Sequence, residues 1–223
     1  MFSSSAKKIV AGGFFKQAPV LFLLAVILAW YAKSASAEEQ GYFAPPEQNQ
    51  CSMQFVYGQD AFDKHAAVKT SPVKFSSITG SFRFDSQTKT VSKLRIAIDV
   101  DSLVTSDRDT GWVMVGPEMF DLNSYEEISL DKLSPTTITG TPSKATAKLT
   151  IRGASKPFEM EIKLLAVEDN AIGFGVLGKE RFVSLALQGS INLADYNMTA
   201  LGSDGIYLGN QLLLAITLKG VKQ

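Results

Sequence analysis

The side chains best suited to catalysis or metal binding are few in this chain, and their spacing argues against both roles. His65 is the single histidine among 223 residues, so a histidine-rich metal site is excluded, and its surroundings suggest no Ser-His-Asp arrangement. Asp99, Asp101, Asp107 and Asp109 lie close together, but they lack the spacing, glycine and terminal glutamate of a calcium loop. We therefore predict no enzyme activity, no metal and no cofactor.

Charge and cysteine content argue against nucleic-acid binding and exclude an internal disulfide. The 22 basic residues balance the 22 acidic ones, so the chain lacks the electrostatic signature of a nucleic-acid-binding protein. Cys51 is the only cysteine, so no internal disulfide can form and packing must stabilise the fold. A reactive thiol is one interpretation of Cys51. The favoured one is a small, partly buried residue near the first strand.

Residues 1–37 have the pattern of a signal peptide. Lys7 and Lys8 precede an apolar run from Val20 to Trp30, and Ala35-Ser36-Ala37 offers the small residues that a signal peptidase recognises. The alternative is an uncleaved anchor, but the apolar stretch of about 15 residues is short for a span of roughly 20. We predict cleavage after Ala37, export to the periplasm, and no stable membrane span afterwards.

Behind this leader, short segments alternate strictly between apolar and polar residues. In residues 158–164 every even position is apolar and every odd position is charged. Side chains of a strand point to opposite faces with period two, so each such segment has one apolar and one polar face. We predict strands over residues 52–57, 75–85, 91–101, 127–132, 136–140, 144–152, 157–167, 170–178, 181–193 and 211–221.

These strands follow one another at short spacing without helical crossovers, which favours an all-β antiparallel barrel of about eight strands. Turn signals include Asp169-Asn170. Residues 38–50 are polar and carry Pro45-Pro46, so we expect a loose N-terminal arm before a barrel domain over residues 51–223. An outer-membrane barrel is disfavoured because the second face of these strands is too charged for lipid.

The alternation stops between Thr105 and Tyr125. Ser106, followed three residues later by Asp109, resembles a helix start, and Pro117 would end the helix. We predict a short helical plug around residues 106–116 at one end of the barrel. The apolar side chains expected to cap that end are Trp112, Val115 and Phe120.

The shared apolar interior, rather than any catalytic group, is expected to be the functional part of the protein. A barrel of about eight strands is just wide enough either to be filled by its own side chains or to hold one small ligand, and the residues favour neither outcome. If a ligand is held, the predicted lining residues are Phe82, Phe84, Leu94, Ile96, Ile98, Trp112, Phe120, Leu149, Ile151, Phe158, Met160, Ile162, Phe174 and Val176.

Three segments in the same order resemble the YceI-like family. The resemblance runs over roughly residues 75–221 and is most specific in the third segment. The segments are residues 98–105 followed by Arg108-Asp109, residues 118–121 leading to Tyr125, and residues 149–153 completed by Lys156-Pro157.

The resemblance implies an extended, lipocalin-like barrel that encloses one elongated amphiphilic lipid, of polyisoprenoid or fatty amide type. Such a protein would serve as a periplasmic carrier or scavenger and would need no catalytic group. The alternative is an envelope structural or interaction module with a filled barrel and no ligand. A homodimer is left open, and no nucleic-acid partner is expected.

Overall fold

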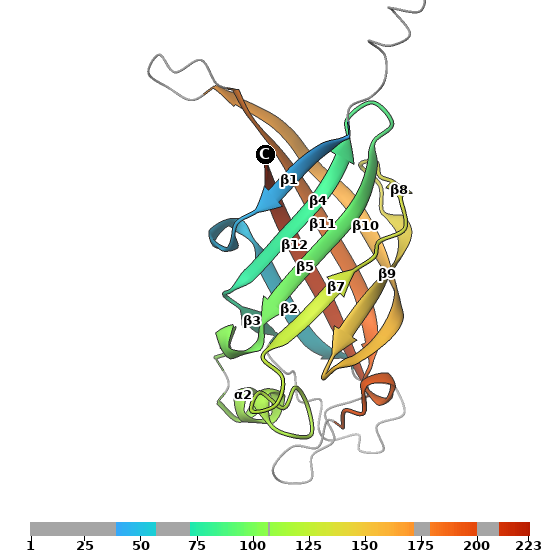
Figure 1. Ribbon diagram of the computed structural model, residues 1–223. Helices are drawn as coiled ribbons and strands as arrows, with labels where there is room; N and C mark the ends of the chain where they lie inside the picture. Colours follow the sequence, from blue (N-terminus) through green and yellow to red (C-terminus); the bar gives the residue numbers. More distant parts are fainter. Residues whose placement is uncertain (1–38, 57–71, 107, 172–178, 200–209) are drawn as a thin grey trace, which may run out of the picture. The chain divides into compact units, whose positions relative to one another are not determined.

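The computed structural model describes residues 39–56, 72–106, 108–171, 179–199 and 210–223 (Figure 1). The predicted signal peptide, His65, and the predicted lining residues Phe174 and Val176 lie outside these ranges. All strands of the described part belong to one sheet. Their bounds are β1 (Gln40–Ala44), β2 (Gln50–Val56), β3 (Val73–Phe75), β4 (Ile78–Asp85), β5 (Thr90–Asp99), β6 (Leu103–Val104), β7 (Glu127–Asp131), β8 (Thr136–Thr137), β9 (Ser143–Ile151), β10 (Ala154–Ala171), β11 (Lys179–Asn192) and β12 (Gln211–Lys222).

The helical elements of the described part are short. One α-helix, α2 (Arg108–Val115), follows β6, as predicted for residues 106–116. Three 3-10 turns connect strands: η1 (Pro46–Gln48), η2 (Val100–Ser102) and η3 (Leu193–Tyr196).

The sheet closes on itself. Neighbouring strands run in the order β1-β4-β5-β7-β9-β10-β11-β12, and β12 pairs back with β1, every pair being antiparallel. The short strands β2, β3 and β6 extend the wall, because β2 also pairs with β12 and β3 lies between β2 and β6. The predicted all-β antiparallel barrel of about eight strands is thus confirmed.

The apolar/polar alternation of the sequence sets the two faces of the wall. Along β9 the buried positions are Ala145, Ala147, Leu149 and Ile151, and the residues between them are exposed or half-buried. The next strand starts after a two-residue turn in which Arg152 (φ 50°) and Gly153 (φ 72°) both have left-handed backbone conformations. Such a turn matches the twist of an antiparallel pair, so it fixes the register of β9 against β10.

Two predicted strand boundaries are wrong. The predicted strand over residues 75–85 is divided into β3 and β4, and Ser76 between them donates its backbone N–H to Ser102. The predicted turn at Asp169-Asn170 is instead part of β10, which stays paired with β11 through Ala171. Asp and Asn favour turns locally, but pairing with β11 overrides that preference here.

The predicted loose arm is also wrong for residues 40–44, which form β1. This strand fills the seam between β4 and β12, and its Tyr42 ring stacks on Phe82 at 5.3 Å between ring centroids. Just before it, Glu39 accepts hydrogen bonds from Ser92 and from Arg83, which lower the pKa of the Glu39 carboxyl. The backbone N–H of Gln223 donates to Gly41 at 3.0 Å, so the residue after β12 lies beside β1.

The junction between β1 and β2 is held by one buried amide. Pro45-Pro46 interrupts the strand, and the side chain of Asn49, 8% exposed, fills the gap. Asn49 Nδ2 donates to the carbonyl oxygens of Ala44, Pro45 and Ile78 at 2.9 to 3.1 Å, while its Oδ1 accepts from the Lys219 backbone N–H. One side chain therefore satisfies backbone groups of three strands at the break.

Gly220 of β12 is packed tightly against the ring of Phe82. A Cβ at Gly220 would lie 2.7 Å from two ring carbons of Phe82, so the ring rests on the glycine backbone. Gly220→Val is expected to lower the free energy of unfolding by about 1–3 kcal/mol, because the ring must leave its stack on Tyr42. Urea unfolding measures this, and Gly140→Val is the control because nothing lies within 4 Å of a Cβ there. Equal effects of the two substitutions would contradict the packing.

Candidate functional site

The inner face of the barrel is apolar and continuous. Of the predicted lining residues, eleven are described and face inward, and none is more than 4% exposed. They come from β4, β5, β9, β10 and the segment after α2, so the structure brings them into one core. They are Phe82, Phe84, Leu94, Ile96, Ile98, Phe120, Leu149, Ile151, Phe158, Met160 and Ile162. Their role in ligand binding stays a prediction.

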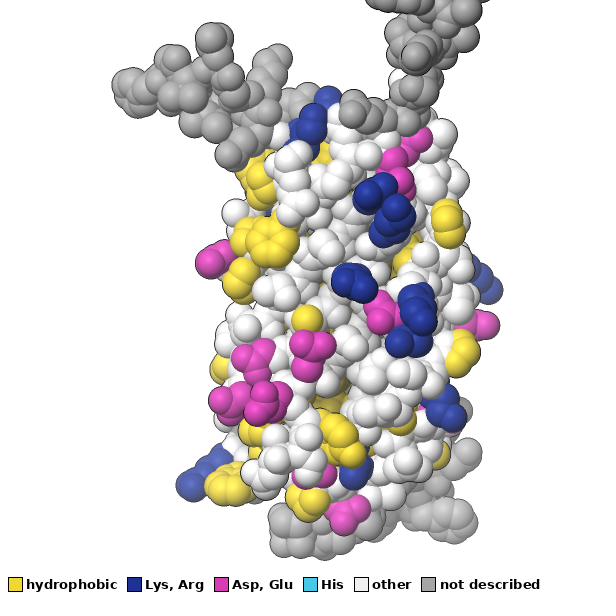
Figure 2. All heavy atoms as spheres, in the orientation of Figure 1, with side chains coloured by type: hydrophobic (Ala, Val, Ile, Leu, Met, Phe, Trp, Pro, Cys, Tyr) yellow, Lys and Arg dark blue, Asp and Glu magenta, His cyan; other side chains and the backbone are white. Residues whose placement is uncertain are grey.

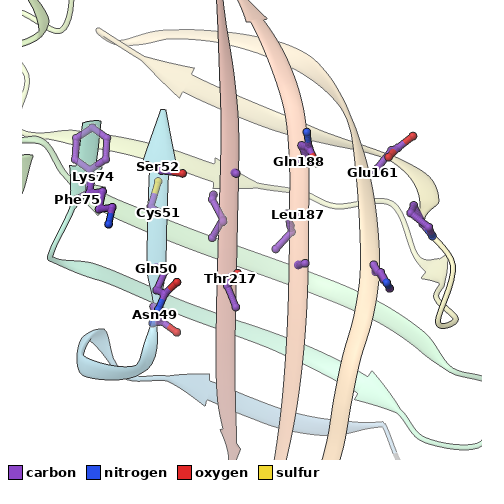
Figure 3. A pocket seen from close by; sticks show the side chains of 15 residues that line it. Asn49, Gln50, Cys51, Ser52, Lys74, Phe75, Glu161, Leu187, Gln188 and Thr217 are labelled. Carbon is purple, nitrogen blue, oxygen red and sulfur yellow. The ribbon is translucent and has the colours of Figure 1, made fainter. Parts of the chain in front are cut away.

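The outer face has the opposite character. Figure 2 shows one side of the wall, where polar and charged side chains predominate and hydrophobic ones are scattered. A pocket of about 450 Å³ lies over β2, β12, β11 and β10, and Figure 3 shows polar side chains such as Gln50, Gln188 and Glu161 around it. A charged and polar lining does not suit an apolar chain, so the interior is the better candidate site.

The inward-facing side chains fill the space that they enclose. Since a water-sized sphere reaches almost none of their surface, a long molecule can enter only if side chains move apart. Methionine, with three rotatable bonds, is the apolar residue that adapts most easily. Every methionine after Met1 is buried: Met53, Met114, Met119, Met160 and Met198.

One end of the barrel is covered by the plug, which we define as residues 108–125 (Figure 1). Its interior contacts come from Met114, Met119 and Phe120, and the Phe120 ring meets Phe75 of β3 edge-on at 6.1 Å. The predicted capping role of Trp112 is wrong, because this side chain is 67% exposed. Two residues advance a helix by about 200°, so a helix that turns Met114 inward must turn Trp112 outward.

The plug has backbone hydrogen bonds of its own, and further hydrogen bonds join it to the segment after η3. Within it, Phe120 donates its backbone N–H to Met114 and Leu122 donates to Val115. Towards the rest of the barrel, Thr199 donates its backbone N–H to the Glu118 carbonyl at 2.8 Å and its hydroxyl to Glu118 Oε2 at 2.9 Å. Both Glu118 and Thr199 are exposed, so this pair of hydrogen bonds lies on the surface.

The opposite end, near the β4–β5 turn, is filled by rings. We call it the aromatic end and define it by Tyr42, Phe82 and Phe84, each no more than 2% exposed. Tyr42 stacks on Phe82 and meets Phe84 edge-on at 6.4 Å. Their strands, β1 and β4, are hydrogen-bonded on both sides, so these rings stand on fixed backbone.

Of the acidic residues singled out in the sequence, Asp99 has a local structural role. Asp99 Oδ1 accepts from the Asp101 backbone N–H at 3.0 Å and thereby caps η2. Asp107 lies outside the described residues. Among the described residues no group of three His, Cys, Asp or Glu side chains could hold a metal ion, and no helix there is long and apolar enough to cross a bilayer.

Cys51 is more deeply buried than expected, at 3% exposed in β2. Burial raises the pKa of its thiol to about 12, so almost no nucleophilic thiolate exists in the folded state. We expect iodoacetamide to leave Cys51 unmodified in folded protein at pH 8 and to alkylate it readily in urea, as mass spectrometry would show. Because the folded pKa lies above the unfolded one, this thiol is expected to favour folding below about pH 9 and less so above it. Fast alkylation without urea would contradict this prediction.

At the two ends of the barrel, buried residues absent from the predicted lining include Tyr42 at the aromatic end and Met114, Met119 and Met198 at the plug end; β11 and β12 add others, such as Leu185 and Leu214. Tyr42 lies in a segment whose prolines are typical of a linker, so its strand had no clear signal. Helical spacing places Met114 opposite Trp112, but so short a helix does not indicate which of the two faces inward.

Comparisons with known proteins agree with this architecture. The YceI-like domain family matches residues 48–219. Protein YceI of Salmonella arizonae is 28% identical over 158 residues, which cover 67% of this chain and 73% of that protein.

Two solved structures share the fold. Burkholderia cenocepacia BcnA has a TM-score of 0.57 at 17% identity and covers 79% of this chain and 98% of its own. The Campylobacter jejuni YceI protein has a TM-score of 0.58 at 18% identity, with 75% and 94% covered. The family match spans most of the barrel, and the chain therefore belongs to the YceI-like family.

Proposed function

We propose that this protein binds one long-chain amphiphilic lipid, of polyisoprenoid or fatty amide type, inside the barrel and acts as a periplasmic carrier or scavenger. The observation that carries the proposal is the unbroken apolar interior inside a polar wall. Membership of the YceI-like family supports the same class of ligand.

The dimensions of the barrel suit an extended apolar tail. β11 has 14 residues, which at about 3.3 Å per residue and a tilt of roughly 40° span about 35 Å along the barrel axis. Each buried CH₂ group would contribute about 0.8 kcal/mol, so a long tail gains enough to offset the rearrangement of packed side chains. No catalytic residue is needed for this task.

Export is part of the proposal and rests on residues 1–37. Cell fractionation of the full-length protein is expected to place it in the periplasm, shortened by the leader, with Glu38 as the first residue in N-terminal sequencing. Full-length protein in the membrane fraction would contradict the cleaved form.

Native mass spectrometry tests lipid binding directly. Protein purified without detergent from its own host is expected to carry one lipid per chain, and delipidated protein should take up one long-chain amine. Absence of both would contradict the proposal. It would favour the second candidate function, an envelope interaction module with a filled barrel, for which the almost inaccessible interior is the specific observation.

A further inference from the structure

The two ends of the barrel are closed in different ways, and this difference assigns a direction to ligand movement. The inference rests on the proposed lipid binding. At the aromatic end the rings of Tyr42, Phe82 and Phe84 stand on strands that are hydrogen-bonded on both sides. Opening that end would require these packed rings to separate between strands whose backbone positions are fixed by pairing.

At the plug end the closing element is separate from the wall. The backbone hydrogen bonds within residues 108–125 allow the plug to move as one body. Its buried contacts are apolar, such as that between Phe120 and Phe75, and a lipid tail could replace them at little cost. The Glu118–Thr199 pair is exposed, so water can satisfy both partners when the pair separates.

The buried side chains at the plug end include three adaptable methionines. Met114 and Met119 belong to the plug, and Met198 precedes the residue that holds it. Flexible thioether side chains can repack around an incoming chain, whereas stacked rings on fixed strands cannot.

We propose that residues 108–125 form the port through which the lipid enters and leaves, with the Glu118–Thr199 pair as its latch. The apolar tail enters first, towards the aromatic end, and the polar head stays at the plug end, where it keeps contact with water.

A reversible cross-link tests the port. The 2.8 Å backbone hydrogen bond keeps the α-carbons of residues 118 and 199 close enough for a disulfide, so Glu118→Cys/Thr199→Cys is made in a Cys51→Ala background. The probe is hexadecylamine dansylated at its nitrogen, and uptake is followed by energy transfer from Trp112, the one tryptophan after residue 37. Oxidised protein is expected to take up the probe at least about tenfold more slowly, with full recovery after reduction.

The control carries its disulfide away from the port. Phe43 and Val221 are directly paired between β1 and β12, so Phe43→Cys/Val221→Cys joins strands that stay together. This variant is expected to take up the probe equally fast when oxidised and reduced. Unchanged uptake by the oxidised 118–199 variant would overturn the port. If wild-type and reduced proteins take up no probe, the proposed function itself fails and the port fails with it.

Two further measurements test the latch and the orientation of the lipid without a cross-link. Thr199→Val removes the hydroxyl of the latch, so uptake and release should both become several-fold faster while the Kd changes little; unchanged rates would overturn the latch. Hexadecylamine dansylated at its nitrogen should accept energy from Trp112 at least about threefold better than hexadecanoic acid dansylated at its terminal carbon, because an extended chain of equal length carries the second label deep towards the aromatic end. The opposite order would overturn the orientation.

Discussion

Met160→Glu is expected to abolish lipid binding. Met160 lies on the inner face of β10, 4% exposed, opposite Ala145 of β9. A carboxylate there has no partner in the apolar interior, and an unpaired buried charge costs several kcal/mol. We expect affinity for dansylated hexadecylamine to fall at least about a thousandfold, as measured by fluorescence titration.

The control for Met160→Glu is a substitution at Glu161, the next residue, which lies on the outer face of β10. Glu161 is exposed, so Glu161→Gln should bind the probe like wild type. Circular dichroism of each variant separates lost binding from lost folding, and Met160→Gln, which is polar but uncharged, should weaken binding less. Binding by a folded Met160→Glu variant at wild-type affinity would show that the lipid does not pass this point of the interior.

Asn49→Asp is expected to lower the free energy of unfolding by roughly 3 kcal/mol or more at pH 7. The two side-chain N–H bonds of Asn49 donate to the carbonyl oxygens of Ala44, Pro45 and Ile78. A carboxylate would place a negative charge against those oxygens and leave them without donors. Urea unfolding followed by circular dichroism measures the loss.

The pH dependence of the lost stability provides a second measurement for Asn49→Asp. Repulsion from the carbonyl oxygens raises the folded-state pKa of the new carboxyl above its unfolded value near 4. The destabilisation should therefore be small below about pH 4 and increase as the pH rises through the folded pKa. Gln50→Glu makes the same chemical change one residue later on an exposed side chain and should change stability little. Equal losses in both variants would contradict the role of Asn49.

The fold could be predicted from the sequence where each strand has one polar, exposed face and one apolar, buried face. The residues alternate without exception from Ala145 to Ile151 in β9 and from Phe158 to Ile162 in β10, so the faces and the pairing of these segments followed from residue types alone. β1 has only five residues and precedes Pro45-Pro46, and its position depends on pairing with β12, about 180 residues away. Local pattern carries no information about such a distant partner.

The candidate site was predictable to the same extent. Inward positions such as Ile98 and Leu149 follow from alternation along a strand, and both are buried. Alternation does not apply to the plug, where a helix of eight residues has too few positions to define its inward side. The size and hydrophobicity of Trp112 suggested burial, but the helix presents Met114 instead. Whether the interior is packed depends on how side chains interlock, which residue types alone do not determine.

The pairing of β1 with β12 has a consequence for biogenesis. Tyr42 faces Lys222 and Gly41 accepts from Gln223, so the position of β1 is completed by β12, which is synthesised about 180 residues later. The barrel cannot close before β12 has been synthesised, and until then its apolar inner face stays exposed. Deletion of β12 would therefore leave β1 and β11 without their common partner, and the barrel would stay open.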